Sequence, residues 1–231
     1  MAYFTEAFLK AIQLLLSFDS ELYGIIFLTL KVSAIALVIS CFIGIPFALL
    51  LFVKRFYGRR LLLNIVSTFM GLPPVVVGLF VYILLSNQMG LFGDLRLLFT
   101  TTAMIIAQVI LALPIVTGLT HSALVSLDNL VMKTAITMGA SPLQILTTML
   151  REARYGIGTA VITAFGRLMA EVGAVMMVGG NVRYQTRVMT TAIALQKGMG
   201  EFQTALALGI ILLMLSFVIN FLLQFLKGRE A

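Results

Sequence analysis

The segment FGRLMAEVGAVMMVGGN, residues 165–181, carries an arginine and a glutamate, Arg167 and Glu171, four residues apart in an otherwise apolar stretch. In a continuous helix, residues i and i+4 share a face, so these side chains can pair. A charge inside a membrane needs such a partner or a water-filled cavity. Three roles follow: a structural ion pair, a gate that exchanges partners, or a direct contact between Arg167 and an anion, for which Glu171 would compete.

The composition assigns the whole chain to the membrane. Of its 231 residues 61% are hydrophobic and only 11% are charged, and the mean hydropathy is +1.09. Runs of about 20 apolar residues span a bilayer. We therefore predict an all-α, polytopic membrane protein with five transmembrane helices, at residues 23–53, 61–86, 98–120, 156–180 and 202–226. At about 1.5 Å per residue from Gly156, Arg167 and Glu171 lie about 16 and 22 Å along the fourth span.

A short amphipathic segment precedes the first span. Its apolar residues recur at helical spacing between Glu6, Lys10 and Gln13; they are Phe4, Phe8, Ala11, Ile12 and Leu15. The segment is too short and too charged to span, so we expect residues 1–20 to form an interfacial helix. Residues 21–231 then form a single transmembrane domain.

The basic residues predict the orientation. One side of the membrane receives nine Lys and Arg residues, including the cluster KRFYGRR at 54–60, and the other receives five. The richer side is expected to be cytoplasmic, which places the N-terminus outside and the C-terminus inside the cytoplasmic (inner) membrane. This distribution accounts for most of the formal charge of +7 without a nucleic-acid partner.

One polar excursion, residues 121–155, separates the third span from the fourth on the predicted cytoplasmic side. It contains KTAITMGASPLQILTTMLREARYG, residues 133–156. Gly139 and Ala140 are small, and Ser141 followed by Pro142 is typical of a helix start. The pattern predicts a helix, a small-residue turn and a second helix.

This segment resembles the EAA loop of type I ABC importer permeases, which forms the coupling helix that docks on an ATPase subunit. Lys133, Thr134 and Ala135 stand at the family's Glu-Ala-Ala, and the Gly139–Pro142 block is intact. The resemblance implies a set of ATPase-coupling residues: Lys133, Thr134, Ala135, Gly139, Ala140, Ser141, Pro142 and Leu143.

Further runs extend the resemblance over nearly the whole chain. They are GLPPVVVGL, TAMIIAQVILALPIVTGL, REARYG, AEVGAVMMVGGN and TRVMTTAIAL. Together they resemble the oxyanion permeases for molybdate and tungstate, and the tungstate type most of all. The resemblance implies the type I permease fold, a homodimer, two ABC ATPase copies that bind ATP and Mg, and an extracytoplasmic oxyanion-binding protein.

The chain itself lacks the residues for ATP hydrolysis, since no Gly-Lys dipeptide of a phosphate-binding loop occurs. His121 and Cys41 are the only residues of their types, so they do not complete a metal site. We expect neither an enzyme nor a cofactor in this chain.

Prolines and glycines inside the spans are candidates for bending. The stretch from Gly71 to Gly78 is the richest, because it holds two consecutive prolines. The candidate path or gate residues are Gly71, Pro73, Pro74, Gly78, Arg167 and Glu171.

Basic residues also occur on the predicted outer side, at Arg183, Arg187 and Lys197. They would steer an anion or dock an acidic binding protein. The alternative is an ordinary solvated loop.

These features favour the permease subunit of an ATP-driven importer of tungstate or molybdate. Two alternatives stay open. One is a stand-alone secondary transporter or channel that uses Arg167 and Glu171, with Glu171 carrying protons. The other is a permease of the same fold for sulfate, phosphate or an amino acid.

Overall fold

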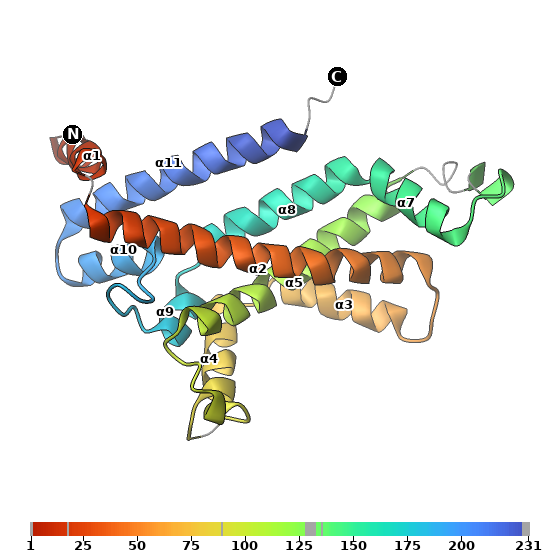
Figure 1. The fold of residues 1–231 in the computed structure, drawn as a ribbon, viewed down its shortest axis with the longest axis horizontal. Helices are drawn as coiled ribbons and strands as arrows, with labels where there is room; N and C mark the ends of the chain where they lie inside the picture. The colour runs from red at the N-terminus through yellow and green to blue at the C-terminus, as the bar shows by residue number, and fades with distance from the viewer. Residues whose placement is uncertain (1, 18, 89, 128–132, 135, 228–231) are drawn as a thin grey trace.

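The computed structural model describes the chain except for residues 1, 18, 89, 128–132, 135 and 228–231. Within the described residues every regular element is helical (Figure 1). Three of these helices are long and apolar enough to cross a membrane uninterrupted, namely α2 (Ser20–Val53), α5 (Thr101–Val125) and α11 (Phe202–Lys227). The predicted first, third and fifth spans are therefore confirmed as helices.

The second and fourth predicted spans are each broken in two. Helices α3 (Arg59–Met70) and α4 (Pro74–Leu85) meet at 104°, and α8 (Arg154–Met169) and α9 (Gly173–Gly179) meet at 57°. The bend in residues 61–86 confirms the predicted bending between Gly71 and Gly78, whereas the continuous helix through residues 156–180, on which the Arg167–Glu171 pairing depended, was wrong. With each bent pair taken as one span, the described chain has the five spans that were predicted.

Two prolines explain the first break. Neither Pro73 nor Pro74 has a backbone N–H to donate, so the α3 ladder cannot continue through them. Gly71 caps α3 by donating its N–H to the carbonyl of Thr68 at 3.1 Å, and Pro74 is the first residue of α4. Proline fits that first position because its missing N–H has no partner there in any case.

Helix α5 lies at the centre and packs against α2, α3, α4, α8 and α9. Small residues let the backbones approach closely, as is common between membrane helices. A Cβ built on Gly44 of α2 would lie 3.0 Å from the hydroxyl of Thr117 on α5. The α2–α5 contact therefore leaves no room for a larger side chain at Gly44.

Helix α1 (Ala2–Leu16) lies against α11 near the start of that helix. Ala7 and Ala11 are buried in the contact, and Lys10 Nζ donates to Thr204 Oγ1 at 2.8 Å. Phe8 and Ile12 are exposed, so part of the apolar face predicted from the sequence stays available to lipid. The side chain of Phe4 is outside the described residues. The helix is confirmed, and its interfacial position stays a prediction.

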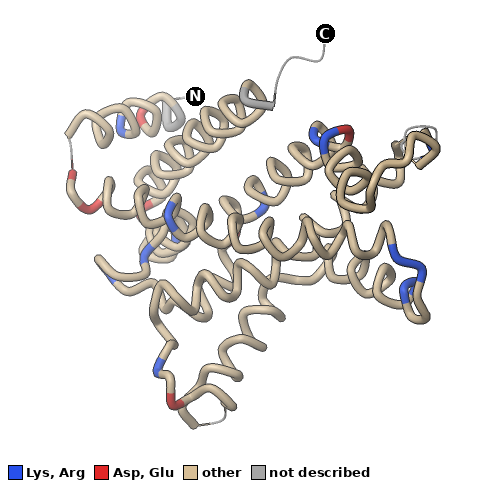
Figure 2. The backbone as a smooth tube through the Cα atoms, turned by 45° about the vertical axis from the view of Figure 1, so that its right-hand side comes forward, with Lys and Arg blue, Asp and Glu red and all other residues tan. Residues whose placement is uncertain are grey.

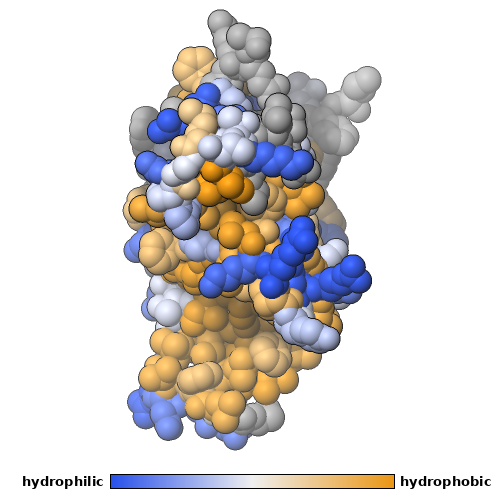
Figure 3. Space-filling model, turned by 90° about the vertical axis from the view of Figure 1, so that its right-hand side faces the viewer, coloured by the Kyte–Doolittle hydropathy of each residue, from blue (hydrophilic) through white to orange (hydrophobic). Residues whose placement is uncertain are grey.

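The two ends of the molecule differ in charge. Lys and Arg gather at the end formed by the last turn of α2, the start of α3, and α7 (Pro142–Glu152), which we call the basic end (Figure 2). Viewed toward that end, hydrophilic side chains lie above and beside broad apolar surface (Figure 3). The opposite end holds the start of α2, residues 181–187 and α10 (Met189–Gly198). A 3-10 turn, η1 (Gly93–Leu95), lies beyond α4.

The polar excursion is shorter than predicted on both sides. Helix α5 continues to Val125, and α8 already begins at Arg154, although the sequence suggested boundaries at Thr120 and Gly156. Arg59 at the start of α3 donates from Nε to the carbonyl of Leu51, and its Nη2 lies 3.5 Å from Nε2 of His121. These contacts join α2, α3 and α5 at the basic end.

Candidate functional site

The break between α8 and α9 contains Glu171, whose side chain is only 5% exposed. Its Oε1 accepts the backbone N–H of Ala174 at 3.0 Å, in the first turn of α9. Its backbone carbonyl accepts the hydroxyl of Thr190 on α10 at 2.7 Å. Glu171 therefore caps one helix and fixes a second.

Arg167 lies on the last turn of α8 and is exposed. It does not pair with Glu171, because the ion pairs within the described part of the chain are both made by Glu21. The expected i to i+4 pairing required a continuous helix through Glu171. Since α8 ends at Met169, the two side chains do not share a helical face. The predicted pairing of Arg167 with Glu171 was therefore wrong.

The second halves of the two broken spans pack against each other. Val77 and Val81 of α4 share a buried core with Ala174, Val175 and Val178 of α9. The contact is close because a Cβ built on Gly78 would lie 2.7 Å from the Cα of Ala174.

The two breaks are also neighbours. A Cβ built on Gly173 would lie 2.9 Å from Val75 Cγ2 and 3.6 Å from Oε1 of Glu171. Glu171 therefore lies where α4 and α9 begin, beside the turn that holds Gly71, Pro73 and Pro74. The structure brings the candidate gate residues into one region, with Arg167 on the outer surface of α8.

A buried amide connects this region to the central helix. Gln108 on α5 is 4% exposed and donates from Nε2 to the carbonyl of Leu168 at 3.4 Å. Its Oε1 has no hydrogen-bond partner within the described residues. The Gln108 amide therefore places a polar group in the apolar core beside the end of α8.

Polar side chains that the sequence interpretation did not use lie on the exposed sides of α3 and α8. They are Asn64, Ser67, Thr68, Thr159 and Thr163. Ser67 and Thr68 follow Asn64 by three and four residues, and Thr163 follows Thr159 by four. This helical spacing within apolar segments could have identified them from the sequence.

Residues 133–143 present the predicted coupling turn at the basic end. Gly139 has φ +76°, which favours glycine, and Ser141 starts α7 with Pro142 in its first turn. Ser141 Oγ accepts the N–H of Gln144 at 3.4 Å, and the Gln144 side chain accepts the N–H of Ser141 at 2.8 Å. This reciprocal capping box confirms the predicted helix start.

Apolar side chains project from this turn. Met138 is 81% exposed and Leu143 is 69% exposed, whereas Met149 on the other face of α7 is buried against α2 and α5. Lys133 and Thr134 are helical and exposed, and Ala140 is half-buried. Ala135 lies outside the described residues. Exposed apolar residues of this kind, beside polar ones, are typical of a protein-binding surface.

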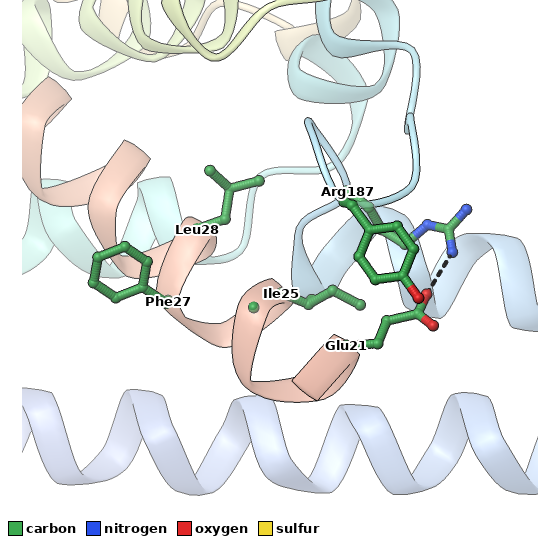
Figure 4. A pocket seen from close by; sticks show the side chains of 7 residues that line it. Glu21, Ile25, Phe27, Leu28 and Arg187 are labelled. Atoms are coloured by element: carbon green, nitrogen blue, oxygen red, sulfur yellow. Dashed lines mark hydrogen bonds and ion pairs between the residues drawn. The ribbon is translucent and has the colours of Figure 1, made fainter. Parts of the chain in front are cut away.

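At the opposite end, two of the three predicted docking residues are engaged within the chain. Arg187 Nη1 donates to Glu21 Oε1 at 3.1 Å (Figure 4). Arg183 Nε donates to the same oxygen at 3.0 Å, and Arg187 Nε also donates to Asn181 Oδ1 at 3.3 Å. Hydrogen bonding to Glu21 raises the pKa of Arg183 above its ordinary value. We call Glu21, Arg183 and Arg187 the outer cluster. It ties the start of α2 to residues 181–187.

The side chains of Arg183 and Arg187 differ in their exposure to solvent. The Arg187 side chain is 16% exposed and that of Arg183 is 59% exposed, while Lys197 at the end of α10 is exposed. A small cavity beside the cluster is lined by Glu21, Arg187 and apolar residues of α2 (Figure 4). Part of the predicted outer positive charge is therefore neutralised within the chain.

The described residues contain no group of three or more His, Cys, Asp or Glu placed to hold a metal ion. The chain is thus a helical membrane protein with two broken spans that pack against each other and an exposed, capped helix turn at one end. The chain is a member of the family of binding-protein-dependent transport system inner membrane components, which matches residues 20–230.

Two curated relatives cover most of the chain. The tungstate uptake system permease protein TupB of Peptoclostridium acidaminophilum is 42% identical over 95% of this chain and 96% of the relative. A probable anion ABC transporter permease protein of Haloferax volcanii is 41% identical over 86% of this chain and 88% of the relative.

A solved structure has the same fold. It is a bacterial ABC transporter involved in the import of the acidic polysaccharide alginate, with a TM-score of 0.78 and 20% identity, covering 94% of this chain and 82% of that one. The type I ABC importer permease fold predicted from the sequence is confirmed.

Proposed function

We propose that the chain is the permease subunit of an ATP-driven, binding-protein-dependent importer of tungstate. The observation that carries the proposal is the 42% identity to a tungstate uptake permease along nearly the full length of both chains. Molybdate and sulfate are the alternative substrates, because both are also tetrahedral dianions, and they serve as the second and third test anions.

The path is proposed to form between two copies of this chain. Five spans are few for a pathway that opens alternately to both sides, and two-fold pairing is the commonest oligomeric arrangement. The exposed polar side chains of α3 and α8 support this arrangement, since polar groups in a membrane helix are expected to face protein or water.

The turn at Gly139 and helix α7 are proposed to dock on a separate ATPase, one per copy. The exposed Met138 and Leu143 provide the apolar contact, and the capping box holds the helix start rigid. ATP and Mg would be bound by that partner. The basic end would then be cytoplasmic, in agreement with its Lys and Arg content. The opposite end, with Lys197 and the outer cluster, would face the binding protein.

The test is ATP hydrolysis in proteoliposomes that contain this chain, its ATPase and its binding protein, compared with tungstate, molybdate and sulfate. Tungstate-loaded binding protein should stimulate hydrolysis most. Gly139→Arg should abolish the stimulation without unfolding the permease.

Gly58→Arg is the matched control. Gly58 also has a positive φ, +90°, and open space around it, but it lies in the turn between α2 and α3, outside the proposed coupling turn. Equal loss in both variants would contradict coupling at Gly139. Ion movement down a gradient by the purified chain alone, with no ATPase bound, would contradict the importer and favour a secondary transporter.

A further inference from the structure

Helix α8 presents an exposed line of polar side chains, with Thr159, Thr163 and Arg167 at intervals of four residues. Arg167 lies about 20 Å from the start of the helix at Arg154, at 1.5 Å per residue. A guanidinium at that depth is unfavourable against lipid and needs water or a counter-charge, whereas the Thr159 hydroxyl donates to the carbonyl of Tyr155 at 3.0 Å within the helix. No carboxylate in the described residues forms an ion pair with Arg167.

Helix α3 has a comparable line. Asn64, Ser67 and Thr68 are exposed, and they recur at three- and four-residue spacing. The exposed apolar residues Leu61 and Ile65 lie about 20–60° from Thr68 around the helix, so they border the polar line. The exposed side of α3 therefore carries polar groups beside apolar ones within a membrane span.

Helices α3 and α8 both pack against α5. A Cβ built on Gly118 of α5 would touch Val66 and Met70 of α3, while Ile115 of α5 packs with Ala164 of α8. Positions 115 and 118 are about 60° apart around α5, so α3 and α8 occupy neighbouring faces of it.

The other flank of α8 is covered by α11. Val161 and Ile162 line a cavity together with Leu223 of α11. Thr163 points about 200° away from Val161 around the helix. The polar line of α8 therefore faces away from α11.

We propose that Asn64, Ser67, Thr68, Thr159, Thr163 and Arg167, together called the polar face, form the wall of the anion path, and that Arg167 is its charge-selective contact. The proposal rests on the proposed import of an oxyanion. Each copy of the chain contributes one polar face.

The donors fit such a ligand. A tetrahedral oxyanion offers only acceptor oxygens, which the Asn64 amide and the Arg167 guanidinium can satisfy, and the planar arginine fork suits it best. The Thr68 and Thr159 hydroxyls already donate to the carbonyls of Asn64 and Tyr155 at 2.8 and 3.0 Å, so they line the wall without donating to the anion. The structure also removes the objection that Glu171 competes for Arg167, because the Glu171 carboxylate is bound to the N–H of Ala174. Exposure of Arg167 keeps the contact hydrated and therefore weak enough to release the anion.

The first test measures access without transport. Thr163→Cys is made in a Cys41→Ala background, since Cys41 is the one cysteine in the sequence and would also react with the reagents. Anionic and cationic methanethiosulfonate reagents are then compared in the assembled transporter. The ratio of anionic to cationic labelling rate should be high, and adding Arg167→Gln should lower it about tenfold, as expected for loss of local electrostatic attraction. Phe42→Cys, on an apolar α2 position that is 83% exposed, should react with neither reagent.

Labelling of Thr163→Cys that is absent, or independent of Arg167, would overturn the proposal. So would equal labelling of Phe42→Cys, because then access would not distinguish the polar face from the lipid surface.

The second test measures transport. With tungstate-loaded binding protein, Arg167→Gln should lower uptake per ATP hydrolysed about tenfold, and Arg167→Lys should keep most of it because the charge remains. Lys31→Gln removes another exposed cation within a span and should have little effect.

The outcomes separate the two levels of inference. If uptake and hydrolysis fall together in Arg167→Gln, or if neither changes, Arg167 is not an anion contact. If the wild-type transporter takes up no tungstate, molybdate or sulfate, the proposed function fails, while the labelling experiment still decides whether the polar face is a charge-selective aqueous wall.

Discussion

Oε1 of Glu171 accepts the backbone N–H of Ala174 at 3.0 Å, so this carboxylate is the cap of helix α9 and not the partner of Arg167. The backbone carbonyl of Glu171 also accepts the hydroxyl of Thr190. One buried residue thus holds α9 and α10 in place at the break in the fourth span. The position explains why an acidic residue is retained in an apolar segment without an ion pair.

Glu171→Gln should be tolerated, because the amide oxygen of glutamine can still accept the Ala174 N–H. Glu171→Ala leaves that buried donor without its partner, and we expect a loss of about 1–3 kcal/mol in the free energy of unfolding. Thermal unfolding of the detergent-solubilised permease would measure the difference.

The same pair of variants tests proton carriage. A secondary transporter that used Glu171 as a proton carrier would lose transport in Glu171→Gln, since an amide does not titrate. Retained uptake in Glu171→Gln together with destabilisation in Glu171→Ala is expected from the cap. Loss of uptake in a stably folded Glu171→Gln would contradict it.

The long spans could be predicted from the sequence because α2, α5 and α11 are apolar runs of sufficient length. The start of α7 could also be predicted, because Ser141 and Pro142 act locally. The breaks in the second and fourth spans were harder to predict from the sequence. Pro73 and Pro74 signal a kink, but the 104° angle depends on how α4 packs against α9 through Gly78, a contact distant in sequence.

The role of Glu171 could not be predicted in the same way. Four-residue spacing with Arg167 implies a pair only if the helix continues, and no proline marks the break after Met169. The outer cluster was missed for a related reason, because Glu21 lies more than 160 residues from its arginines in sequence.

Gly78→Ala should destabilise the permease by about 1–3 kcal/mol, because the new methyl group would overlap the backbone of Ala174. Separation of α4 from α9 should also lower uptake, if the two broken spans move together. Gly209→Ala on α11 is the control, since a Cβ there meets nothing within 4 Å. Equal unfolding temperatures for the two variants would show that the α4–α9 contact is not tight.

Ser141→Ala should weaken coupling to the ATPase. It removes one half of the capping box, which costs about 1 kcal/mol of helix stability at the start of α7. Hydrolysis stimulated by loaded binding protein should fall several-fold while the permease stays folded. Ser126→Ala, which removes another exposed serine with a local hydrogen bond, should have no such effect. Full stimulation in Ser141→Ala would argue against a contact that depends on the start of α7.

Glu21→Gln should accelerate association with an acidic binding protein, whereas Lys197→Gln should slow it. Glu21 neutralises Arg183 and Arg187, so its loss releases positive charge at the opposite end, and Lys197 supplies charge that is already exposed. Changes of roughly two- to fivefold in association rate are expected at low salt and should vanish at high salt, because exposed charges are screened. Glu6→Gln on α1 is the control for an acidic residue outside the outer cluster. A slower association in Glu21→Gln at every salt concentration would mean that the cluster acts by ordering residues 181–187, and that the arginines support the docking surface without providing its charge.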